Sequence, residues 1–258
     1  SRCDKTHSYG LRPGFCIDLT TPNAVGEYWD LNRPDQQDQL RRLQERERPS
    51  LVIGSPPCTD FLRLLHLRLS RKDIEKRQEE HGKPYVRTCV ETYWKQLDMG
   101  NHFLHEHPSP SESWSMPEVQ ELEADPRVFK VKGPMCRWEM RSNDAAGVGY
   151  VRKQTTWLTS SKELAETLAR KCSGDHRHVH LIGESRAAAA EYPVKVVLAI
   201  LRAFRRQLKR DGRWNEMNAF DAGPVPEEDE NHWWTQMEQE HGMYWDDVNG
   251  DWLDPREV

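Results

Sequence analysis

A cysteine held by two prolines is the residue of this chain best suited to nucleophilic chemistry. Cys58 follows Pro56 and Pro57, whose rings fix the backbone that presents the thiol. A rigidly held thiol near the amide groups that open a helix can have a lowered pKa, as a nucleophile requires. The alternative is a buried cysteine in a tight turn, which has no chemical role.

Glu106 stands between His105 and His107, just before Pro108. A partly desolvated carboxyl group can act there as a general acid or as a hydrogen-bond donor. The three residues resemble a metal site, but neighbours on a strand point to opposite faces, so Glu106 cannot share a face with both histidines. We therefore predict an acid here and no metal ligand.

An aspartate and a group of cysteines and histidines complete the chemically capable residues. Asp18 closes a short apolar run, and an acid at such a strand end can accept hydrogen bonds from ribose; the alternative is a carboxylate that caps a turn. The closely spaced group consists of Cys172, His176, His178 and His180. With Cys136 it offers zinc-ligand types, whereas the alternative is an exposed polar strand or a phosphate-facing basic loop. The spacing matches no strong zinc pattern, and we predict no metal.

Strands and helices in alternation must position these side chains. Short apolar, β-prone runs predict strands at residues 14–19, 50–54, 102–106, 127–131 and 155–159. Capped or amphipathic segments predict helices at residues 36–47, 73–82, 85–100, 113–123, 162–171 and 194–208. Alternation over residues 14–110 predicts an α/β fold with a Rossmann-like, doubly wound and mostly parallel sheet. Ligands of such sheets bind beyond the carboxyl ends of the strands, where Asp18, Cys58 and Glu106 would lie.

Charge divides the chain into two parts. Residues 221–258 hold twelve acidic residues against one basic residue, and four of the ten tryptophans, whereas residues 1–220 carry a formal charge of +6. We predict an α/β domain over residues 1–212 and an acidic, tryptophan-containing tail over residues 213–258. The mildly basic body is compatible with nucleic-acid contact. The basic residues of 202–213 could follow phosphates, or form a solvated helix face against which the acidic tail packs.

Targeting signals are missing from the sequence. It has no apolar run long enough for a membrane span, and it starts with neither a signal peptide nor Met, as expected for a piece of a longer protein. Six cysteines without a tight pairing pattern indicate reduced thiols and an intracellular protein.

Two of these segments resemble motifs of the cytosine-5 DNA methyltransferases. Residues 51–58, Leu-Val-Ile-Gly-Ser-Pro-Pro-Cys, resemble that family's Pro-Cys strand, and the strand of Glu106 resembles its Glu-Asn-Val strand, with Glu-His-Pro instead. Asp18 and Asp30 stand where the family holds the ribose and adenine of S-adenosylmethionine. The resemblance implies this cofactor, with Asp18, Asp30, Pro56 and Pro57 in its site, and a sheet that here lacks its first, glycine-rich strand.

The same resemblance implies a reaction. Cys58 would attack C6 of cytosine, Glu106 would protonate or hydrogen-bond N3, and S-adenosylmethionine would supply the methyl group. Arg137 and Arg141 are the nearest match to the family's Gln-x-Arg-x-Arg motif.

A wider resemblance is to a module of copia-type retrotransposon polyproteins. It is carried by residues 53–59, 103–108, 113–114, 135–136 and 174–178, and residues 246–255 resemble the lead-in to a reverse transcriptase. It implies either a nuclear methyltransferase acting on nucleic acid, DNA in particular, or a catalytically degenerate relative that binds nucleic acid or a partner.

Overall fold

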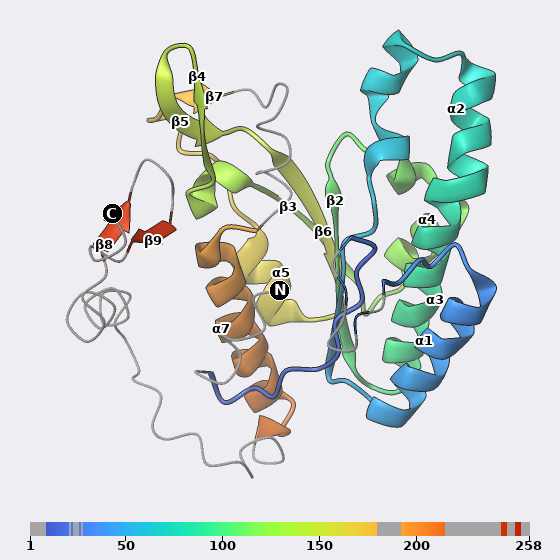
Figure 1. Ribbon diagram of the computed structural model, residues 1–258. Helices are drawn as coiled ribbons and strands as arrows, with labels where there is room; N and C mark the ends of the chain where they lie inside the picture. Colours follow the sequence, from blue (N-terminus) through green and yellow to red (C-terminus); the bar gives the residue numbers. More distant parts are fainter. Residues whose placement is uncertain are drawn as a thin grey trace.

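The chain folds as an α/β protein in which a central four-stranded sheet has helices on both faces (Figure 1). This computed structural model describes residues 9–20, 22, 26, 28–179, 192–214, 244–246 and 251–253. Helices α1, α3 and α4 cover one face, and α5 and α7 cover the other (Figure 1). No helix of the described ranges is long and apolar enough to span a bilayer.

The elements predicted from residue 36 onward in the described ranges appear in the predicted order, and the structure adds short strands at residues 141–144, 147–151, 178–179, 244–246 and 251–253. The helices are α1 (Pro34–Glu47), α2 (Arg71–Arg77), α3 (Lys83–Asp98), α4 (Pro117–Ala124), α5 (Lys162–Leu168) and α7 (Val194–Arg210). The strands are β1 (Leu51–Gly54), β2 (His102–Pro108), β3 (Phe129–Pro134), β4 (Arg141–Asp144), β5 (Gly147–Val151), β6 (Gln154–Thr159), β7 (His178–Val179), β8 (Tyr244–Asp246) and β9 (Asp251–Leu253).

The main sheet is mixed, so the prediction of a doubly wound, mostly parallel sheet is wrong. Its order is β1-β2-β6-β3; β1 and β2 are parallel, but β6 runs antiparallel to both β2 and β3. The cause lies between β3 and β6, where the chain forms a 3-10 turn and the β4–β5 hairpin instead of a crossover helix. The amide of Met135, just after β3, donates to the carbonyl of Lys153, just before β6, at 2.9 Å. The chain therefore re-enters the sheet at the C-terminal end of β3, and β6 must run antiparallel to β3.

The predicted strand at residues 14–19 does not form. Residues 11–18 are irregular, and Phe15 and Ile17 pack against a cluster that includes Leu40 of α1 and Tyr85 of α3. The apolar side chains of this segment therefore bury themselves on the helices instead of entering the sheet. Asp18 accordingly ends no strand.

Alternation along β2 divides the core between the two faces of the sheet. Phe103 packs with Val90 and Tyr93 of α3, whereas Leu104 packs with Leu164 of α5 and Ile200 of α7. Residues 105 and 107 therefore lie on the α3 face and residue 106 on the α5–α7 face. This alternation decides what surrounds Glu106.

Two smaller sheets lie outside the main one. β5 pairs with β4 in an antiparallel hairpin and with β7 in parallel. This three-stranded sheet projects beyond the N-terminal end of β6 (Figure 1). β8 and β9 pair in an antiparallel hairpin. The rest of the acidic tail, and with it the predicted packing of the tail on α7, lies outside the described residues.

Candidate active site

The site predicted around Cys58 lies at the end of β1, beside β2. After Gly54 the chain runs through Ser55, Pro56 and Pro57 and enters a 3-10 turn at residues 59–61, with the carbonyl of Cys58 accepting from the amide of Phe61 at 3.0 Å. The thiol is half-buried. Burial, and next the carboxylate of Glu106, raise the pKa of Cys58, so the expected lowering of this pKa is not found.

Glu106 is buried on β2, directly opposite Trp157 of β6. Desolvation raises the pKa of its carboxyl group, although Lys153 and Tyr192 oppose the rise. Lys153 Nζ lies 3.6 Å from Oε1, and this oxygen has no hydrogen-bond partner among the described residues. Glu106 thus lies in the partly apolar surroundings predicted for an acid, and Lys153 is the cation beside its Oε1.

The structure places the loop of Cys58 beside the strand of Glu106, because β1 and β2 are paired neighbours with Gly54 opposite His105, and the charge of Glu106 contributes to the raised pKa of the thiol. Lys153 is the third member of the site, and its positive charge opposes the rise in the pKa of both groups. The sequence prediction missed this residue. Lys153 reaches Glu106 because β6, which begins one residue later, pairs antiparallel with β2, whereas the prediction was a mostly parallel sheet.

Tyr192, the second missed residue, joins the site from the residues just before α7. Its hydroxyl lies 2.5 Å from the Ser55 hydroxyl, and its ring lies 5.9 Å from that of Trp157. Burial and the charge of Glu106 hold the pKa of Tyr192 well above its usual value, so the phenol stays neutral. A neutral hydroxyl here connects the loop after β1 with the carboxyl group of Glu106.

Two buried histidines lie on the other face of β2, and one of them, His107, holds the proline loop. His107 Nε2 donates to the Pro56 carbonyl at 2.9 Å, and Nδ1 accepts from the Ser113 hydroxyl at 2.5 Å. Burial lowers the pKa of His107 to about 4, and it also lowers that of His105. His105 Nδ1 lies 3.0 Å from the Tyr93 hydroxyl. Both rings face away from Glu106, as the alternation along the strand predicted, so the three residues do not converge on one point.

The two aspartates expected to hold a nucleoside are engaged locally. Asp18 Oδ1 accepts from the amide and the hydroxyl of Thr20 at 2.7 and 2.9 Å, which is the turn-capping alternative. Asp30 Oδ1 accepts from the Tyr85 hydroxyl at 2.9 Å and from the Asn32 amide at 3.0 Å. The acids are near each other in the fold, since the Trp29 amide donates to the Asp18 carbonyl at 3.0 Å. Neither one terminates a strand, so the strand-end position on which the expected ribose site was based is not present.

The two arginines expected to take part in catalysis make their described contacts in the three-stranded sheet and the segment before β7. Arg137 donates to the Ser173 hydroxyl at 3.3 Å, and Arg141 donates to the Tyr150 hydroxyl at 3.3 Å. The cation that the structure places at Glu106 is Lys153.

The basic face of α7 is largely engaged by the protein itself. Arg206 and Arg210 contact Glu163 at 3.1 and 3.5 Å, and Arg213 donates to Asn101 at 2.8 Å. The Arg205 guanidinium lies 4.7 Å from the centre of a Trp214 ring. Part of this charge is therefore paired with Glu163 of α5, whereas the packing of the acidic tail that the alternative predicts lies outside the described residues.

Comparison with protein-family models, with curated proteins and with solved structures finds no match for this chain.

Proposed function

We propose that this chain is a cytosine-5 methyltransferase-like module of a copia-type retrotransposon polyprotein, and that its site activates cytosine in nucleic acid, DNA in particular. The observation that carries the proposal is the pairing of a half-buried thiol, Cys58, with a buried carboxyl group, Glu106, at the neighbouring ends of two parallel strands. Lys153 adds a positive charge within 3.6 Å of that carboxyl group. The proposal includes an intracellular, nuclear location, where DNA is present.

Glu106 and Lys153 have properties that attack on cytosine requires. The thiolate sulfur of Cys58 forms a bond to C6, the C5–C6 π pair shifts to C4–C5, and the C4–N3 pair moves onto N3. Glu106 delivers its proton to N3, so its raised pKa, caused mainly by burial, keeps the donor form available. Lys153 favours the thiolate, against the burial that disfavours it. The base must first leave a duplex, which otherwise hides C5 and C6.

S-adenosylmethionine, when bound, would supply the methyl group for C5. The described residues do not fit the cofactor site that the resemblance implies, because Asp18 and Asp30 are held by local donors and end no strand. Activation of the base is therefore the chemistry that we assign to this chain's own residues.

A second function, a catalytically degenerate module that binds nucleic acid or a partner, is favoured by one observation. The pKa of Cys58 is raised by burial and by Glu106, and a protonated thiol does not attack C6. The two functions differ in whether cytosine bound at the site gains reactivity at C5.

Exchange of the C5 hydrogen of cytosine separates these functions and needs no methyl donor. The addition of Cys58 makes C5 nucleophilic, so C5 takes a deuteron from heavy water before hydrogen is lost and the C6–S bond breaks. A single-stranded oligonucleotide containing cytosine is incubated with the chain and analysed by mass spectrometry. We expect exchange that Cys58→Ala abolishes and that Cys16→Ala, a change at an exposed cysteine, leaves unchanged.

Glu106→Gln keeps the shape of the acid but cannot protonate N3, and it should slow this exchange by about 100-fold or more. No exchange by a folded chain that still binds the oligonucleotide would refute base activation and support the degenerate module. If S-adenosylmethionine binds and methylates C5, 5-fluorocytosine should trap a Cys58 adduct. Exchange of the C5 hydrogen without formation of this adduct would show that the chain activates cytosine but does not use S-adenosylmethionine to methylate it.

A further inference from the structure

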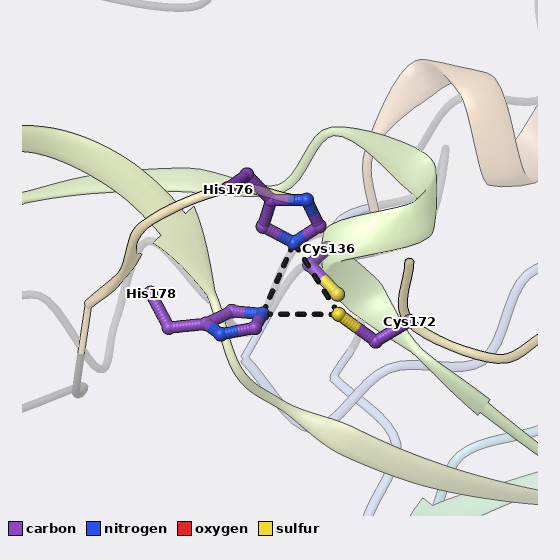
Figure 2. A group of neighbouring side chains, drawn as sticks. All are labelled: Cys136, Cys172, His176 and His178. Carbon is purple, nitrogen blue, oxygen red and sulfur yellow. Dashed lines mark hydrogen bonds between the residues drawn. The ribbon is translucent and has the colours of Figure 1, made fainter. Parts of the chain in front are cut away.

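Four side chains from separate parts of the chain meet beside the three-stranded sheet (Figure 2). Cys136 lies in the 3-10 turn that follows β3, Cys172 and His176 lie in the segment after α5, and His178 lies on β7. Their potential ligand atoms, two sulfurs and two ring nitrogens, all lie within 4.8 Å of one another. His180, the other candidate of the sequence group, lies outside the described residues.

The three distances among Cys172, His176 and His178 are those of one face of a tetrahedron around a metal ion. Cys172 Sγ lies 3.5 Å from Nε2 of both His176 and His178, and these two nitrogens are 3.1 Å apart. Zinc bonds of about 2.3 Å to sulfur and about 2.0–2.1 Å to nitrogen place S and N about 3.5 Å apart, and two N about 3.3 Å apart, at tetrahedral angles. Three edges of the group therefore agree with zinc coordination to about 0.2 Å.

Hydrogen bonds alone do not explain why these atoms converge. Each neutral imidazole nitrogen has either one N–H or one lone pair, directed along a single line. Nε2 of His176 and of His178 each lie close to the other and to Cys172 Sγ, so one direction would have to serve two partners. Figure 2 shows both rings directed toward the same small space beside the two sulfurs. A cation at that point accepts all of the lone pairs together.

Neighbouring groups orient the ligands as they do around structural metals. His176 Nδ1 lies 3.0 Å from the Asp175 carboxylate, which fixes its hydrogen on Nδ1 and leaves Nε2 free to coordinate. The Gly174 amide donates to Cys172 Sγ at 3.4 Å. Gly174 has a φ of +77°, a conformation that favours glycine and that turns the chain from Cys172 back toward His176.

We propose that Cys136, Cys172, His176 and His178 bind one Zn²⁺ ion as a structural Cys2His2 site. Two thiolates and two imidazoles in tetrahedral array select zinc among common divalent ions, and four protein ligands leave no open position for catalysis. The ion would join the end of β3 to β7, a strand of only two residues, and so hold the three-stranded sheet in place. The prediction of no metal, which was based on the spacing of these residues, would then be wrong because the fold, and not the spacing, brings Cys136 to the histidines.

The test is metal stoichiometry and the Co²⁺ spectrum of the full chain, purified under reducing conditions. We expect one zinc per chain, and intense tetrahedral and thiolate-to-metal bands after replacement by Co²⁺. Cys136→Ser and Cys172→Ser should each weaken the thiolate band or abolish binding. Cys16→Ser and His81→Asn, at exposed positions, should keep both.

Asp175→Asn serves where a ligand variant fails to fold, because the side chain of Asp175 is 75% exposed and is not a ligand. It should weaken Zn²⁺ affinity by about 10- to 100-fold in competition with a chelating dye. A folded chain that binds no zinc or Co²⁺, or binding unaffected by Cys136→Ser and Cys172→Ser, would overturn the proposal. A cluster of iron and sulfide on the same residues would also overturn it, and iron analysis identifies that outcome. Methyl transfer is not involved, so the result is independent of the function proposed for Cys58.

Discussion

Gly54 ends β1 one residue before the loop of Cys58, and an alanine there should destabilise the protein through one identifiable atom. A Cβ on Gly54 would collide with the hydroxyl of Tyr93, and the ring carbon Cζ would be the next nearest atom at 3.0 Å. That hydroxyl contacts Nδ1 of buried His105 at 3.0 Å, and Nε2 of the same ring has no partner in the described part of the chain. Displacing the hydroxyl therefore leaves His105 with no partner on either nitrogen.

The magnitude follows from two contributions. Overpacking costs about 1–3 kcal/mol, and the unpaired buried imidazole costs about 1–3 kcal/mol. Gly54→Ala should thus lower the free energy of unfolding by about 2–6 kcal/mol. Tyr93→Phe should cost only the second contribution, because its stacking on Phe103, with ring centres 4.5 Å apart, is retained.

The double variant gives the decisive measurement. In the Tyr93→Phe background the colliding hydroxyl is already absent, and the ring needs to move only a few tenths of an ångström, so Gly54→Ala should cost less than about 1 kcal/mol. Urea unfolding monitored by tryptophan fluorescence measures all four proteins. Gly14→Ala, where a Cβ meets nothing within 4 Å, is the matched control. Equal costs of Gly54→Ala in the two backgrounds would refute the collision with Tyr93.

Three further changes test other parts of the site and fold. Lys153→Met removes the charge that opposes the raised pKa of Cys58, so the midpoint of iodoacetamide alkylation of Cys58 against pH should rise, while Lys162→Met should not move it. Burial lowers the pKa of His107 to about 4, so the unfolded chain binds more protons than the folded chain between pH 6.5 and 4. The free energy of unfolding should therefore fall as the pH falls through this range, by on the order of 3 kcal/mol from this group. Urea titrations of His107→Gln should show a smaller fall. Ser161→Ala removes the hydroxyl that caps α5 and should cost about 1–2 kcal/mol in the same urea assay, and a cost near zero would contradict the cap.

Local pattern was enough to predict most elements, because their signals lie within the segments themselves. The apolar run at residues 51–54 and the amphipathic period of residues 83–98 and 194–210 appear as β1, α3 and α7 within a few residues of the predicted bounds. The run at residues 14–19 has the same local character, yet its apolar side chains find a partner surface on α1 and α3. Local propensity cannot reveal which surface a segment will cover.

The candidate site was predictable as far as it depends on strand ends. Cys58 and Glu106 follow from two neighbouring parallel strands, whereas Lys153 and Tyr192 depend on the path of the chain after β3. That path is set by long-range pairing, which no spacing in the sequence encodes. The contact of Cys136 with the histidines depends on the same path, since β7 is added to the sheet through β5.

The place of β6 between β2 and β3 has a consequence for how the chain folds. β6 pairs with β2 on one side and with β3 on the other. The edges of β2 and β3 that face β6 therefore stay unpaired until residues 154–159 have been synthesised, and the earlier part of the chain cannot complete the sheet. The side chains of β2 are almost all buried in the folded protein. Until β6 pairs with β2, the free edge of β2 can pair with another chain. A product that ends before residue 154 should therefore associate with itself, and the closing of the sheet by β6, a non-local step, should limit the folding rate.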